Sequence, residues 1–78
     1  MTHFNVGRAF VTLDEGRTPD GHRASAWITL PRDRTRYRSS IMVETTRSRP
    51  RDAKRERVRQ LRELRAAINA TLEHLECQ

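Results

Sequence analysis

Short bursts of apolar residues, separated by turn-forming residues, fill the first part of the chain. Three segments carry them: residues 8–15 (RAFVTLDE), 22–30 (HRASAWITL) and 36–46 (RYRSSIMVETT). In 22–30 the apolar and polar positions alternate with a period of two, which is typical of a strand with one buried face. The pattern therefore predicts a three-stranded antiparallel meander over residues 8–46, preceded by an N-terminal segment, 1–7.

Turn chemistry between these segments supports the meander. Pro19 suits the first central position of a β-turn and Gly21 the position after the turn, so a hairpin is expected between the first two strands. Pro31 ends the second strand, because proline lacks the N–H group that a strand ladder needs.

The apolar period changes to that of a helix beyond residue 47. Ser48 is a candidate N-cap, and Pro50 is tolerated in a first helical turn. At 100° per residue, five apolar side chains fall within one arc, with Val58 at its edge: Leu61, Leu64, Ile68, Leu72 and Leu75. The sequence thus predicts one long amphipathic helix over 48–76, with this arc facing the core, and an α+β fold of the order β-β-β-α.

The length of the chain limits it to a single domain, 1–78, with a small core. Self-association would enlarge that core, so a homodimer is expected. No apolar run approaches the roughly 20 residues that a membrane span needs, and the lone Cys77 has no disulfide partner. These features favour a protein without a membrane partner, located in the cytoplasm.

The predicted helix is longer than the predicted strands. A helix of this size is about 40 Å long, whereas the strands reach about 20 to 30 Å. Because Val58 is the first large apolar residue of the helix, we expect segment 49–57 to extend beyond the sheet.

Alternation in the strands assigns side chains to two faces. The face toward the helix is expected to carry Val11, Leu13, Ala26, Ile28, Ile41 and Val43. The opposite face then presents Phe10, Trp27 and Met42, rimmed by Arg8 and Arg38. One helix covers only one face, so this second cluster predicts an interface. Three occupants fit: a second copy of the chain, stacked nucleic-acid bases, or a different protein.

Positive charge is concentrated where the helix begins. The formal net charge is +6, and residues 47–59 (RSRPRDAKRERVR) hold seven cations against two carboxylates. Such a surface favours phosphate backbones or acidic proteins. The candidate contacts are Arg49, Arg51, Arg55, Arg59 and Arg62. The alternative interpretation is a solvated helix face, in which pairs such as Asp52 with Arg55 and Glu56 with Arg59 offset repulsion between arginines.

Residues that carry catalysis are sparse in the sequence. His74 and Cys77 stand three positions apart, but a zinc site needs further ligands. There is no nucleophile elbow and no glycine-rich phosphate loop. The sequence therefore predicts a protein that is not an enzyme, has no cofactor and binds no metal.

Two functions follow as hypotheses. The first is a small basic binding protein that acts as a regulatory or accessory factor on nucleic acid or on a nucleoprotein complex. The second is an inhibitor or adaptor that binds another protein, of the kind that phages encode against host defence or host regulators, without contacting nucleic acid.

Overall fold

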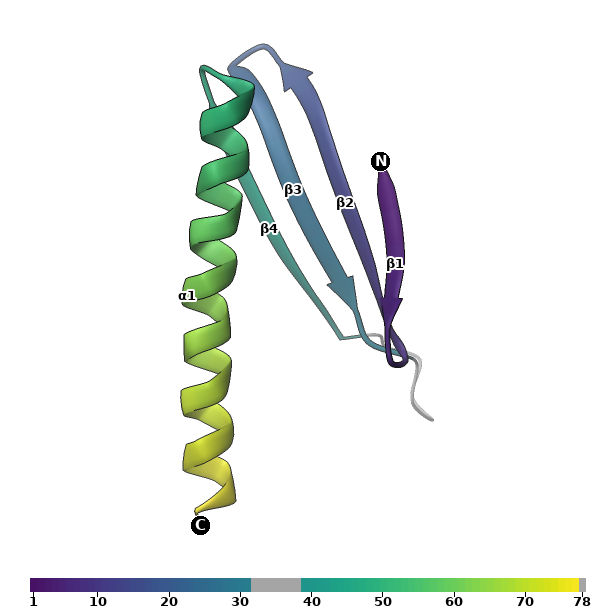
Figure 1. The fold of residues 1–78 in the computed structure, drawn as a ribbon, viewed down its shortest axis with the longest axis vertical. Helices are drawn as coiled ribbons and strands as arrows, with labels where there is room; N and C mark the ends of the chain where they lie inside the picture. Colours follow the sequence, from purple (N-terminus) through teal and green to yellow (C-terminus); the bar gives the residue numbers. More distant parts are fainter. Residues whose placement is uncertain (32–38, 78) are drawn as a thin grey trace.

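The computed structural model describes residues 1–31 and 39–77, which form an antiparallel sheet followed by one helix (Figure 1). Each strand pairs with its neighbour in sequence, so the order across the sheet is β1-β2-β3-β4. The α+β class and the single C-terminal helix are as predicted. The elements are β1 (Thr2–Val6), β2 (Ala9–Thr18), β3 (Gly21–Thr29), β4 (Ser40–Arg47) and α1 (Pro50–Glu76).

The sheet has four strands, so the prediction of three strands was wrong. The segment 1–7, expected to precede the sheet, contains β1, which pairs with β2 from Thr2 opposite Leu13 to Val6 opposite Ala9. Gly7 has a φ of 58°, the left-handed conformation that a tight hairpin turn requires and that glycine adopts without strain. All five residues of β1 are exposed, since α1 contacts β3 and β4 and not β1.

Helix α1 begins two residues later than predicted. Arg49 occupies the N-cap position and makes no side-chain capping bond, and Pro50 opens the first turn. Ser48 is therefore not the N-cap. The predicted strand over 36–46 corresponds to β4, and its first part, 36–38, lies outside the described residues.

The predicted division of the sheet into two faces is confirmed by the strand register. Ala26 lies between Leu13 and Val43, whereas Trp27 lies between Thr12 and Met42. Leu13, Ala26 and Val43 lie on the face toward α1, whereas Thr12, Trp27 and Met42 lie on the face away from it. The buried residues on the side of α1 are Val11, Ala24, Ala26, Val43 and Thr45.

Close packing between α1 and the sheet is confined to the first half of the helix. Ala53 is 1% exposed and Ala24 is fully buried, because small side chains let the helix approach the sheet closely. The Thr45 hydroxyl donates to the Ala53 carbonyl oxygen at 2.8 Å, and the Ala24 carbonyl oxygen lies 3.4 Å away. This buried hydrogen bond joins β4 to α1 at the point of closest contact.

The C-terminal half of α1, and not segment 49–57, extends beyond the sheet, which corrects the prediction (Figure 1). Only Ser48 and Arg49 connect β4 to α1, so the helix must start at the edge of the sheet. This connection passes so close to Gly21 that a Cβ there would lie 2.5 Å from the Arg47 carbonyl oxygen. As α1 continues, it diverges from the strands, and residues 66–77 are all exposed.

We predict that Ala53→Leu destabilises the fold by about 1 to 3 kcal/mol, because a larger side chain forces the helix away from Ala24 and breaks the Thr45 hydrogen bond. Ala66→Leu is the matched control, since Ala66 is exposed on the same helix and should change the free energy of unfolding by less than about 0.5 kcal/mol. Chemical denaturation measures both values. Equal effects of the two variants would contradict the packing described for Ala53.

Candidate nucleic-acid interface

Four arginines follow the side of α1 that points away from the sheet. At 100° per residue they fall within an arc of about 80°, roughly 120 to 180° from the buried Ala53. All four are exposed, and none forms an ion pair with the described residues. We call them the arginine ridge: Arg51, Arg55, Arg62 and Arg65.

The arginine ridge runs along the helix surface in two halves, Arg51 with Arg55 and Arg62 with Arg65. From Arg51 to Arg65 it spans fourteen positions, about 21 Å at 1.5 Å per residue. Val58 is exposed between its two halves, and a shallow depression is lined by Val58, Leu61, Arg62 and Arg65. Arg65 was not singled out from the sequence, although its spacing of three from Arg62 places it on the same side.

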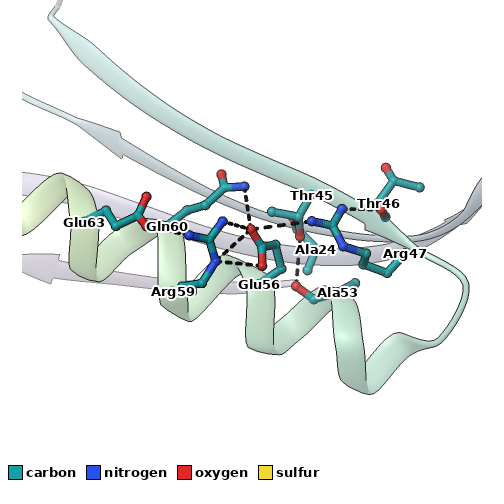
Figure 2. Close-up of polar contacts among 9 residues, drawn as sticks. All are labelled: Ala24, Thr45, Thr46, Arg47, Ala53, Glu56, Arg59, Gln60 and Glu63. Atoms are coloured by element: carbon teal, nitrogen blue, oxygen red, sulfur yellow. Dashed lines mark hydrogen bonds and ion pairs between the residues drawn. The ribbon is translucent and has the colours of Figure 1, made fainter.

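Arg59, also a candidate contact, lies to one side of the arginine ridge, and Glu56 and Glu63 neutralise its charge (Figure 2). Its Nε donates to both carboxylate oxygens of Glu56, at 3.0 and 2.9 Å, and its Nη1 donates to Glu63. The predicted pairing of Glu56 with Arg59 is thus confirmed. No hydrogen bond or ion pair joins Asp52 to Arg55 in the part of the chain that the structure describes.

Glu56 is the centre of this polar cluster. Gln60 Nε2 donates to it at 3.2 Å, and Arg47 Nη2 from β4 approaches to 3.5 Å, as Figure 2 shows. The hydrogen bond from Arg59 lowers the pKa of Glu56 from 4.5 to about 2, helped by the Gln60 bond and by the charges of Arg59 and Arg47. The same contacts raise the pKa of Arg59. The cluster links β4 to α1, and the positive charge of Arg59 is balanced by the carboxylates within it.

Arg57 anchors α1 to the sheet, a role that was not predicted. Its side chain is 11% exposed. Nη1 donates to the backbone carbonyl oxygens of Asp14 at 3.2 Å and Ser25 at 2.9 Å, and Nη2 pairs with Glu15 at 3.2 Å. Arg57 follows Ala53 by one helical turn and therefore lies on the same side of α1. This spacing is the feature of the sequence that could have placed Arg57 toward the sheet.

Arg49, the remaining candidate of the helix, is exposed at the N-cap of α1. It forms no ion pair with the described residues, but it precedes the first turn and does not lie in line with the arginine ridge. Three of the five predicted helix contacts therefore lie together: Arg51, Arg55 and Arg62.

The outer face of the sheet carries the second predicted cluster. Trp27 and Met42 are direct cross-strand neighbours, and Phe10, on β2, is exposed like them. His3 of β1 was missed; its ring stacks on Phe10 with centroids 5.5 Å apart, and its Nδ1 lies 3.1 Å from the Thr12 hydroxyl. Arg8 is exposed in the turn between β1 and β2, and Arg38 lies outside the described residues.

No protein-family model, curated protein or solved structure matches this chain. Among residues 1–31 and 39–77, no three His, Cys, Asp or Glu side chains gather as metal ligands would. Nor does α1, the helix within those ranges, have the apolar length needed to cross a membrane.

We predict that Glu56 makes the fold sensitive to acid. Because its pKa is lowered from 4.5 to about 2 on folding, the stability that its ionised form contributes is present above pH 4.5 and is lost as the pH falls towards 2. Glu56→Gln should flatten the fall in melting temperature over this range. Glu44→Gln, at an exposed carboxylate of β4 outside the cluster, is the control and should follow the parent. If the parent and Glu56→Gln curves run parallel, the cluster does not stabilise the fold.

Proposed function

We propose that this protein is a non-enzymatic, basic nucleic-acid-binding protein that acts as a regulatory or accessory factor, with the arginine ridge contacting phosphates. The observation that carries the proposal is the sorting of charge on α1. Arg57 and Arg59 are matched by carboxylates, whereas the four arginines of the ridge face solvent without such partners in the described part of the chain.

The surrounding charge supports this interpretation. Residues 49–65 hold eight cations and three carboxylates, within a chain whose net charge is +6. Of those three carboxylates, Glu56 and Glu63 are engaged by Arg59 on the flank of the helix, so they lie to one side of the ridge. A strip of one sign produces a field that raises the local concentration of a polyanion and speeds association.

The shape of the ridge also suits a phosphate backbone. Guanidinium groups present planar forks that bind phosphate oxygens through two hydrogen bonds. A helix with its side chains is about 10 to 12 Å across, comparable to the roughly 12 Å width of the major groove of B-DNA. Because α1 contacts the sheet on the opposite side, the four arginines of the ridge are exposed and can approach a duplex.

We predict that replacing Arg55 and Arg62 with Gln weakens binding to duplex DNA and flattens the slope of log affinity against log salt by about two units, since two phosphate contacts are lost. The fold should remain intact, because Gln is a good helix former and both positions face solvent. Fluorescence anisotropy over a salt series measures the slope.

Arg8→Gln with Arg17→Gln is the matched control. It removes the same charge from exposed sites outside α1 and should leave the slope near that of the parent. If the two double variants lose affinity equally, only net charge matters and the arginine ridge is not the contact surface. If the parent binds neither DNA nor RNA at low salt, the proposed function is wrong.

The exposed cluster on the outer face of the sheet favours a second candidate function, that of a protein-binding inhibitor or adaptor. Phe10, Trp27 and Met42 leave a large share of their apolar surface in water, which is typical of protein interaction sites. The two candidates differ in their response to Trp27→Ser. Nucleic-acid affinity should be unchanged under the first, whereas binding of a protein captured by the parent should be lost under the second.

A further inference from the structure

The second half of α1 diverges from the far end of the sheet (Figure 1). We call the apolar surface on either side of this divergence the wedge; it comprises Ile28, Leu30, Ile41, Ile68, Leu72 and Leu75. A pocket of about 380 Å³ in this wedge is lined mainly by apolar side chains. On the helix, Ile68 is 40%, Leu72 47% and Leu75 58% exposed. The residues that line the pocket are Ile28, Leu30, Ser39, Ser40, Ile41 and Ile68.

A single copy of the chain has a very small core. No large apolar side chain is fully buried among the described residues, and the buried apolar residues are only alanines and valines. Domains of this size have little stability to spare even when their apolar side chains are well covered. Covering the wedge would therefore enlarge the core.

We propose that the wedge is filled by α1 of a second copy of the chain, antiparallel to the first, with Ile68 on the two-fold axis. The five apolar residues of the predicted arc are spaced by three, four, four and three positions, so their pattern is symmetric about Ile68. In an antiparallel pair Leu61 meets Leu75, and Leu64 meets Leu72. Such reciprocity is what an interface between identical copies requires.

Charge selects the antiparallel arrangement over the parallel one. The basic half of α1, residues 49–65, has a large excess of cations, whereas residues 66–77 contain Glu73 and Glu76 and neither Lys nor Arg. Antiparallel helices place the acidic end of one copy beside the basic half of the other. Parallel helices would set the two basic halves side by side, where like charges repel.

The sequence suggested the outer face of the sheet as an interface for a second copy. The wedge is a better dimer surface than that face. On the outer face, the exposed apolar residues alternate with polar ones, including the ion pair of Arg23 with Asp14 at 2.9 Å. The wedge instead joins apolar side chains of β3, β4 and α1 in one pocket. It also leaves Arg51, Arg55 and Arg62 uncovered, so this inference stands whether or not the proposed function is correct.

Cysteine cross-linking tests the arrangement directly. The variant with Ile68→Cys and Cys77→Ser should form a covalent dimer on mild oxidation, because the two introduced thiols meet at the axis. Glu73→Cys with Cys77→Ser is the matched control and should stay uncross-linked, since position 73 lies on the opposite side of the helix from the wedge.

The natural Cys77 adds a second control. In the antiparallel arrangement each Cys77 lies opposite residue 59, so the two natural thiols are about 27 Å apart along the axis, far beyond disulfide reach. Parallel helices would bring them together. Rapid disulfide formation by the parent, or none by the Ile68→Cys variant, overturns the proposal.

Light scattering gives an independent test. The parent should have twice the chain mass of 9.2 kDa at micromolar concentration, and Leu72→Glu should reduce the mass to that of one chain or abolish the helical circular dichroism signal. Trp27→Ser, on the outer face, should keep the doubled mass. A folded, monomeric parent, or loss of the dimer in Trp27→Ser but not in Leu72→Glu, contradicts the proposal.

Discussion

The contact between the first half of α1 and the sheet is the interaction on which the rest of the structure depends. Arg57 reaches across the sheet to the carbonyl oxygens of Asp14 and Ser25, and Thr45 donates to the carbonyl oxygen of Ala53. Burying most of an arginine side chain is costly unless its N–H groups find acceptors, and here Nη1 donates to the two carbonyl oxygens and Nη2 donates to Glu15. These bonds hold the first half of α1 against the sheet and fix the rotation of the helix about its own axis.

The rotation of α1 decides which charges are available. With Ala53 and Arg57 toward the sheet, the arginine ridge must face solvent, and Glu56 and Glu63 fall on the flank where Arg59 neutralises them. The same anchor leaves residues 66–77 of the helix exposed. The candidate binding surface and the candidate dimer surface are therefore two consequences of one packing arrangement.

The parts of this fold that depend on residues close together in the sequence could be predicted. The two faces of the sheet follow from a period of two, and the pair of Glu56 with Arg59 follows from helical spacing. Strand β1 was missed, because the alternation of Phe4, Asn5 and Val6 is short and the place of the strand depends on pairing with β2. Trp27 and Met42 were expected to lie together, whereas the stacking of His3 on Phe10 was not, since it requires β1.

The direction in which α1 overhangs could not be derived from lengths alone. Helix and strand lengths show that one end must be free, but the end is chosen by contacts between residues far apart in the sequence. Arg57 bonds to carbonyls 32 and 43 positions away. The predicted core arc centred on Ile68 was wrong as a monomer core for the same reason, because the anchoring residues Ala53 and Arg57 lie several turns earlier on the helix.

Residue-resolved amide hydrogen exchange, measured at several protein concentrations, tests the central claim most directly: α1 is held to its own sheet by its first half and to a second copy by its second half. Protection of residues 54–61 should be high and independent of concentration, whereas protection of residues 66–75 should rise with concentration as copies associate. Equal protection of both halves at every concentration would show that the helix is held along its whole length within one chain, and would contradict the account.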